Sequence, residues 1–313
     1  MSPVTGMLLQ LGYRNAVLLP LLSRSTKSYS TMAATPVQSF QLDRNIFNRS
    51  FYDDVRNFWF EGMPSNASTA PFPVLQKWWG INRTDEEKKA FDDECRAKFG
   101  AALDSIGPSK LALPTFKSYE EDIEHSDQLS APFLSDVKGV QKEDEMKGAE
   151  TMLSMIILLD QMPRQIYREP EELSLVYNHY DRLASSLVRS CMSLKPSPVD
   201  HQAWKARPAY KTWIVMPLVH TEHIPTHMLQ REKLAELRQE CEAAKDEAAL
   251  GYLERAEQAS VDHLDPLKRF GRYPHRNECL GRKNSPEEDE FMKTAQTFGV
   301  KQSKKTSEQK DEL

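Results

Sequence analysis

The densest group of residues able to do chemistry lies near the C-terminal end, in Asp262–Arg282, which reads DHLDPLKRFGRYPHRNECLGR. From Lys268 to Lys283 there are six Lys or Arg and one acid, Glu278, a local balance of +5 in a chain whose formal net charge is −5. Arginines at this density repel one another unless carboxylates or an anionic ligand neutralise them. A guanidinium binds carboxylate or phosphate through two parallel hydrogen bonds. The segment therefore predicts either an Arg/Asp/Glu lattice or a pocket for a small anion.

The same segment holds two histidines, His263 and His275, whose side chains ordinarily titrate near neutral pH. If the segment forms an anion pocket, either histidine can serve as its acid or base. Gly271, Pro274 and Gly281 mark turns, so the arginines should project from a shaped loop rather than from one regular face.

A second segment, Leu158–Arg164, reads LLDQMPR and places Asp160 and Gln161 directly after an apolar run. A buried carboxylate is unfavourable unless it is paired or hydrogen-bonded. Asp160 therefore predicts either a site residue or a buried Asp–Arg network, with Arg164 four residues on. We expect Asp160 to lie within hydrogen-bond reach of an Arg or His from another segment.

A third segment, Pro217–His223, reads PLVHTEH. On one continuous helix His220, His223 and His227 would share a face, which is a metal-ligand pattern. Pro225 interrupts that helix, so no metal is expected, and His220 and Glu222 are the candidate site residues. The alternative is that His220 is a hydrogen-bonded core residue.

The elements that must position these groups are expected to be helices. Only 12 of the 313 residues are Gly, and Glu, Lys, Leu and Ala are common, which favours helix over sheet. No alternation typical of strands has useful length. Helices are predicted over 46–59, 84–99 (with Thr84 and Glu87 as a capping box), 119–130, 147–162, 171–190, 201–221, 228–259 and 285–298.

Three details of these helices bear on the site. Met152–Leu159 is apolar on nearly every side, so this helix should lie in the centre of the helical stack, and Pro163 should end it. The segment 107–145 is expected to be rich in loops. The charged segment 228–259 is expected to form an exposed αα-hairpin that reaches out from the body, with Leu234, Leu237, Cys241, Ala244 and Ala248 as its apolar stripe.

The two ends of the chain carry targeting signals that conflict with each other. Residues 1–42 lack Asp and Glu and contain Arg14, Arg24 and Lys27, a composition typical of a mitochondrial transit peptide. The last four residues, KDEL, spell an ER-retention signal, and Met32 offers a start for a cytoplasmic form. A mitochondrial location is expected, with the ER lumen or the cytoplasm as the alternatives. Residues 1–42 are predicted to be a disordered or targeting segment, 43–300 one helical domain and 301–313 a disordered tail. The four cysteines show no paired spacing and are expected to be reduced thiols in helices.

Six stretches resemble, in order, the blocks of the domain of unknown function family 924. They read VRNFWFEG, KWWG, FDDECRAKFG, MLSMIILLDQMPRQIYR, MPLVHTEH and DHLDPLKRFGRYPHRNECLGRKNSPEEDEF, and they run from about Asp53 to Phe298. The resemblance implies stacked antiparallel helices like those of the tetratricopeptide-like superfamily, and it assigns no reaction. The chain departs from the family where 228–259 is longer than usual. The motif residues that the resemblance implies here are Asp160, Gln161, Arg164, His220, Glu222, His263, Arg269, Arg272, His275, Arg276, Asn277 and Arg282.

Two functions remain open. In the first, the blocks converge on a pocket for a small phosphate- or carboxylate-bearing ligand, with Asp160, His220 and His275 as catalytic residues of a hydrolase or transferase and the remaining motif residues binding the ligand. In the second, the chain is a helical scaffold for a protein partner. The net charge argues against a nucleic-acid partner, and no membrane span, cofactor or metal is expected.

Overall fold

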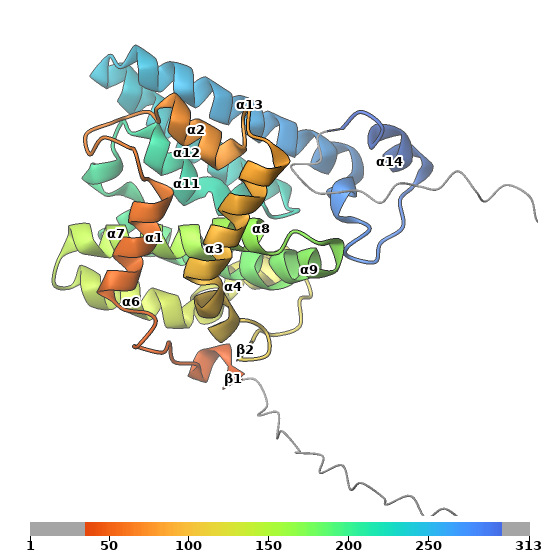
Figure 1. The fold of residues 1–313 in the computed structure, drawn as a ribbon, viewed down its shortest axis with the longest axis horizontal. Helices are drawn as coiled ribbons and strands as arrows, with labels where there is room; N and C mark the ends of the chain where they lie inside the picture. The colour runs from red at the N-terminus through yellow and green to blue at the C-terminus, as the bar shows by residue number, and fades with distance from the viewer. Residues whose placement is uncertain (1–34, 296–313) are drawn as a thin grey trace, which may run out of the picture. The chain divides into compact units, whose positions relative to one another are not determined.

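Helices make up nearly all of the regular structure in residues 35–295, the part of the chain that the computed structural model describes (Figure 1). The first part contains α1 (Arg49–Trp59), α2 (Phe72–Trp79), α3 (Asp85–Ser105), α4 (Tyr119–Glu124), α5 (Ser126–Leu129) and α6 (Ala131–Gln141). The middle contains α7 (Glu145–Ile156), α8 (Met162–Ile166), α9 (Pro170–Leu175), α10 (Asp181–Ser193) and α11 (Pro208–Val219). The last part contains α12 (Ile224–Ala244), α13 (Glu247–Phe270) and α14 (Pro286–Phe291). The predicted all-α class is confirmed, and tetratricopeptide-like packing stays a prediction.

Shorter elements connect these helices. Two π-helical turns, η2 (Ile157–Gln161) and η3 (Val176–Tyr180), join α7 to α8 and α9 to α10. The 3-10 turns are η1 (Val37–Ser39), η4 (Pro198–Asp200), η5 (Gln202–Trp204) and η6 (Pro274–Arg276). Two strands of two residues, β1 (Thr35–Pro36) and β2 (Leu111–Ala112), pair in parallel.

The helix starts predicted at Thr84 and Ser285 are confirmed, whereas the ends predicted for the same two helices are not. The helices predicted to begin at 46, 201 and 228 begin instead at Arg49, Pro208 and Ile224. Thr84 and Glu87 form the expected capping box at the start of α3, and Ser285 caps α14. α3 does not stop at Gly100 but runs to Ser105, because Phe99 and Leu103 pack in the core, which outweighs the weak helix propensity of one glycine. α14 ends at Phe291 and is followed by turns over 292–295 instead of helix, and residues 296–298 of the predicted helix lie outside the described part.

The central helix α7 is buried as predicted, and every side chain of Met152–Leu159 that is apolar is fully enclosed. Pro163, however, does not end this helical run, which continues through η2 into α8. In η2 the Met162 N–H donates to the carbonyl of Ile157, five residues back. This wider turn relieves the clash that a proline makes with the carbonyl four residues before it.

The predicted αα-hairpin is present as α12 and α13, but it does not reach out from the body. Both of its helices pack along α11 (Figure 1), and Leu234, Leu237 and Cys241 are buried there. Ala244 and Ala248 are exposed, and Ala249 and Leu253 continue the buried stripe instead.

Further predictions are corrected at the level of single segments. Residues 107–145 contain α4, α5 and the eleven-residue α6 as well as loops. Val37 and Leu42 are buried, so folded structure begins before the boundary predicted at 43, and residues 1–34 and 296–313, with their predicted addresses, lie outside the described part. Cys95, Cys191 and Cys241 are free thiols in helices, whereas the free thiol of Cys279 lies in a turn. Within residues 35–295, no helix is both long enough and apolar enough to cross a bilayer.

Candidate functional site

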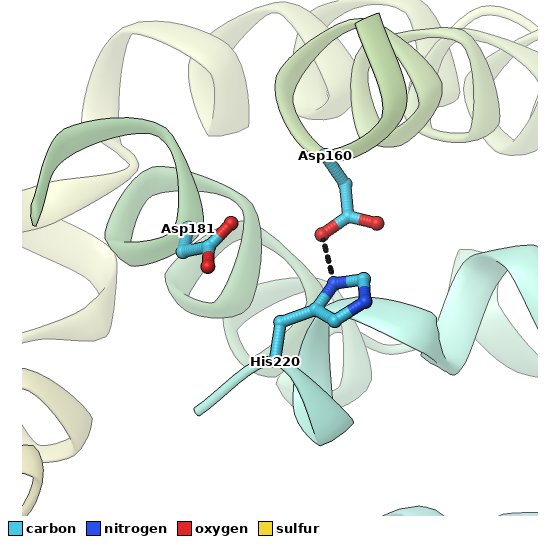
Figure 2. Close-up of side chains that lie close together, drawn as sticks. All are labelled: Asp160, Asp181 and His220. Carbon is cyan, nitrogen blue, oxygen red and sulfur yellow. Dashed lines mark hydrogen bonds and ion pairs between the residues drawn. The ribbon is translucent and has the colours of Figure 1, made fainter. Parts of the chain in front are cut away.

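Asp160 and His220, 60 residues apart in sequence, meet in the interior (Figure 2). Asp160 lies in the π-turn η2, and His220 caps the C-terminal end of α11. His220 Nδ1 donates to Asp160 Oδ1 over 2.7 Å, and the carboxylate is 0% exposed. Gln161 Nε2 donates to the other carboxylate oxygen. Asp160 therefore orients the imidazole and leaves its Nε2 atom on the far side of the ring.

The charges around this pair fix its protonation state. Burial raises the pKa of Asp160, but the charge of Arg164 and the hydrogen bonds from His220 and Gln161 outweigh burial, so the pKa lies below its ordinary value. Burial and the Arg164 guanidinium lower the pKa of His220 in spite of Asp160. The pair is therefore a carboxylate and a neutral imidazole at neutral pH.

Arg164 joins this pair to a second buried carboxylate, Asp181, at the first position of α10. Its Nη1 lies 2.8 Å from Asp181 Oδ1 and 3.5 Å from Asp160 Oδ1. Oxygen and nitrogen atoms of Asp160, Asp181 and His220 all lie within 4.8 Å of one another, so these side chains could serve as metal ligands. The guanidinium of Arg164 already contacts both carboxylates, which disfavours a dication there.

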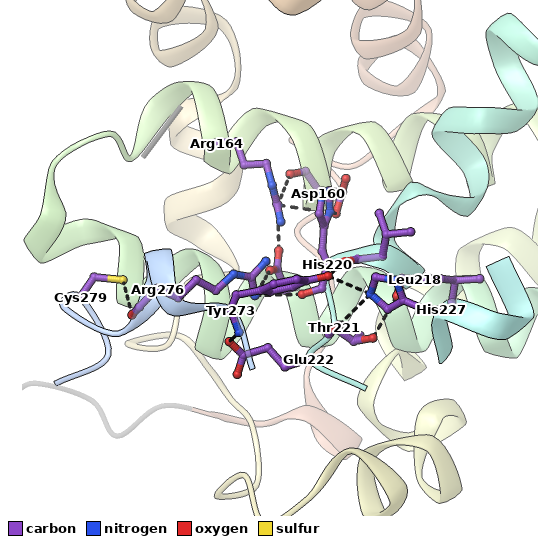
Figure 3. Close-up of polar contacts among 12 residues, drawn as sticks. Asp160, Arg164, Leu218, His220, Thr221, Glu222, His227, Tyr273, Arg276 and Cys279 are labelled. Carbon is purple, nitrogen blue, oxygen red and sulfur yellow. Dashed lines mark hydrogen bonds and ion pairs between the residues drawn. The ribbon is translucent and has the colours of Figure 1, made fainter. Parts of the chain in front are cut away.

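Arg276 brings the C-terminal segment to the same place (Figure 3). It projects from η6, donates from Nη1 to the carbonyl of His220 over 2.9 Å, and lies 3.7 Å from Asp181 Oδ2. The rings of Tyr177 and Tyr273 face its guanidinium at 4.1 and 4.7 Å from their centroids. Arg276 thus fixes the backbone at His220 and helps neutralise Asp181.

The other arginines of the segment are divided between a lattice and the surface. Arg282 forms two hydrogen bonds of 2.6 and 2.7 Å to Glu222, which also accepts from the Tyr273 N–H. Arg272 donates twice to Glu288, each time over 2.7 Å, and this hydrogen bonding lowers the pKa of Glu288 to about 2. Arg269 is half exposed and lies 3.6 Å from Asp265.

The remaining predicted residues surround this group without forming one array. The ring of His263 lies 6.4 Å from that of His220, and the ring of His275 stacks on Tyr273. Burial lowers the pKa of His263 to about 3 and that of His275 to about 2, so neither binds an anion as a cation at neutral pH. Asn277 is buried and donates to Asn284.

A small cavity of about 20 Å³ opens beside His220 and Asp181, enough for about one water-sized group. Polar side chains of α10 form one wall of it: Asp181, Arg182, Ser185, Ser186 and Arg189. The rest of the lining includes Tyr119, Ser126, Tyr177, Thr221 and Thr226.

The structure therefore gathers Asp160, Gln161, Arg164, His220 and Arg276 at one place, with Glu222 and Arg282 adjoining through Tyr273. It places Arg269 and Arg272 away from this group, in contacts with Asp265 and Glu288.

Sequence reasoning missed Asp181 and the cavity wall of α10. The five polar residues of that wall recur at intervals of one, three and four positions and share one side of the helix. Apolar residues such as Leu183, Leu187 and Val188 occupy other positions of this helix, which is almost wholly buried. The polar stripe could therefore have predicted, from the sequence, a polar wall in the interior of the protein.

Comparison of the chain with known proteins identifies its family but no activity. Residues 55–296 match the sequence profile of a family described as bacterial protein of unknown function, DUF924. The chain belongs to the DUF924 family. A protein of unknown function from Agrobacterium tumefaciens is similar to this DUF924 chain at 19% sequence identity and a TM-score of 0.43, covering 80% of this chain and 98% of that one. None of the curated proteins matches this DUF924 chain.

Proposed function

We propose that this protein binds a small anionic ligand whose charged group enters the cavity beside His220, and that His220 acts there as general acid or base in a hydrolytic or transfer reaction. The hydrogen bond of 2.7 Å between His220 Nδ1 and the buried carboxylate of Asp160 carries the proposal. A carboxylate that holds Nδ1–H sets the tautomer whose Nε2 accepts a proton, as a general base must.

The surroundings of His220 favour base chemistry over anion binding by the imidazole itself. Because burial and Arg164 lower its pKa, the ring is neutral at neutral pH and free to accept a proton. Proton transfer by a positioned side chain typically contributes 10²- to 10⁴-fold to rate. In this scheme Asp160 is a positioning residue, since it acts through His220.

The test is a screen with a paired variant. Wild type is incubated with phosphorylated metabolites, dicarboxylates and monocarboxylates, and with chromogenic esters and phosphate monoesters for turnover. We expect at least one anion to raise Tm, since a ligand that binds only the folded state stabilises it, and any turnover to fall roughly 100-fold or more in His220→Asn. His125→Asn is the matched control, because that histidine bonds its own helix carbonyl at Glu121 and lies outside the cavity.

A scaffold for a protein partner is the second function, and exposed apolar side chains near α2 favour it. Phe72 and Trp79 are each 54% exposed, and Ile81 follows them, whereas large apolar side chains clustered at a surface are typical of interaction sites. A screen with no anion that raises Tm, and with no turnover, contradicts the ligand-binding proposal and leaves the scaffold as the better reading.

A further inference from the structure

Arg189, on the last turns of α10, is the one guanidinium lining the cavity for which residues 35–295 supply no carboxylate partner. Its Nη2 donates to Thr226 Oγ1, and its Nε is buried without a hydrogen-bond partner within the described residues. Burial alone lowers its pKa. A partly buried charge without a counter-charge destabilises the folded protein. A residue that is unfavourable for stability in this way is expected to serve binding instead.

The charges of the surrounding network leave one positive charge over. Asp122 forms two hydrogen bonds with Arg182, and Arg164 and Arg276 both contact Asp181, with Arg164 also near Asp160. With Arg189 the buried groups are four guanidiniums against three carboxylates, with His220 neutral. The carboxylate of Glu120, which hydrogen bonds through Thr226 and His223 connect to Arg189, is 72% exposed and is left out of this count. A ligand with one negative charge completes the balance.

We infer that Arg189 is the anion-recognition residue of this cavity and that the ligand presents to it a single carboxylate group. The planar fork of Arg189 matches a carboxylate, and Ser185 and Ser186 line the same wall. A phosphate monoester carries about −1.5 to −2 charges at neutral pH and would leave the network with excess negative charge. The inference rests on the proposed function, and it names the substrate class: small monocarboxylates whose charged group enters the cavity next to His220.

The first experiment uses the unliganded protein. Arg189→Met removes the uncompensated charge and should raise Tm by about 2–4 °C, a shift typical for a domain of this size. Arg207→Met is the matched control, because Arg207 also has no carboxylate partner among the described residues but donates to the carbonyls of Ser65 and Ala67 and stacks on Tyr210. That variant should lower Tm. A lower Tm for Arg189→Met as well would mark Arg189 as a structural residue and overturn the inference.

The second experiment compares ligand classes at constant ionic strength, which keeps screening equal. Acetate and benzoate are titrated against inorganic phosphate and methyl phosphate, with Tm as the readout. We expect a carboxylate at tenfold its Kd to raise the wild-type Tm by about 3 °C, an unchanged response in Arg207→Met, and none in Arg189→Met.

The outcomes separate this inference from the function on which it rests. A response to phosphates alone, or an equal carboxylate response in Arg189→Met, overturns the inference and leaves the ligand-binding proposal standing. No response to either class contradicts both.

Discussion

At the scale of single residues, the arginines between Lys268 and Lys283 differ in what neutralises them. Arg282 and Arg272 each meet a carboxylate through two hydrogen bonds, and Arg276 contacts two tyrosine rings and lies beside Asp181. The lattice that the sequence offered as one of two readings therefore accounts for most of this positive charge. The unpaired charge lies on α10 instead, at Arg189.

A lattice role predicts that removing Arg282 destabilises the unliganded protein. The side chain of Glu222 is only 9% exposed and would keep its charge without a partner. We therefore expect Arg282→Ala to reduce the free energy of unfolding by about 2–4 kcal/mol, somewhat below the value for a fully buried pair because the guanidinium is 25% exposed. Arg269→Ala is the control from the same segment, where a half-exposed ion pair and ring contacts contribute only about 0.5–1 kcal/mol. Urea denaturation measures both, and equal losses would contradict the distinction.

At the scale of elements, the features that depend on residues close together in sequence could be predicted. The capping boxes at Thr84 and Ser285 depend on residues three positions apart, so the sequence reveals them. The π-turns η2 and η3 depend on tertiary packing, and no local pattern signals them. Yet η2 holds Asp160, and Asp181 follows η3, so the two carboxylates of the site sit where the helical hydrogen bonding widens, as is frequent at functional sites.

Dependence on tertiary packing also limited what the sequence could predict about the site. The sequence identified Asp160, His220 and Arg276 by residue type, and the structure brings them together. It could not show that Arg272 would meet Glu288, because that depends on the path of the chain after η6. The polar stripe of α10 can be recognised in the sequence, but the burial of these side chains depends on neighbours that are distant in sequence.

The turn between α12 and α13 offers a test at this scale. Lys245 ends α12 with φ of 55°, a left-handed conformation that is unfavourable for any residue with a Cβ. We expect Lys245→Gly to raise the free energy of unfolding by about 0.5–1 kcal/mol. Ala243→Gly, two residues earlier in the helix, should lower it by a similar amount. Urea midpoints measure the pair, and a shift of the same sign in both variants would contradict the explanation.

At the scale of the whole molecule, several histidines are buried in neutral form. Burial lowers the pKa of His179 and of His227 to about 4, and that of His275 to about 2. In the unfolded chain each returns to about 6.5. Below that pH the unfolded state binds more protons than the folded state, so acid favours unfolding.

The fold should therefore lose stability on mild acidification, before its carboxylates titrate. Above about pH 7 these histidines are neutral in both states and contribute nothing to the pH dependence. Between pH 7.5 and 5.5 each should remove about 1.3 kcal/mol of unfolding free energy. Carboxylates with lowered pKa, such as Glu222 and Glu288, lose their contribution only below about pH 4.5. Urea unfolding at several pH values measures the slope. His179→Gln, which can still donate to the carbonyl that His179 contacts at Ile106, should reduce that slope by one histidine's share. A free energy of unfolding that does not change down to pH 5.5 would mean that these histidine rings take up protons inside the folded protein. The proposal that a neutral His220 accepts a proton at neutral pH would then lose its support.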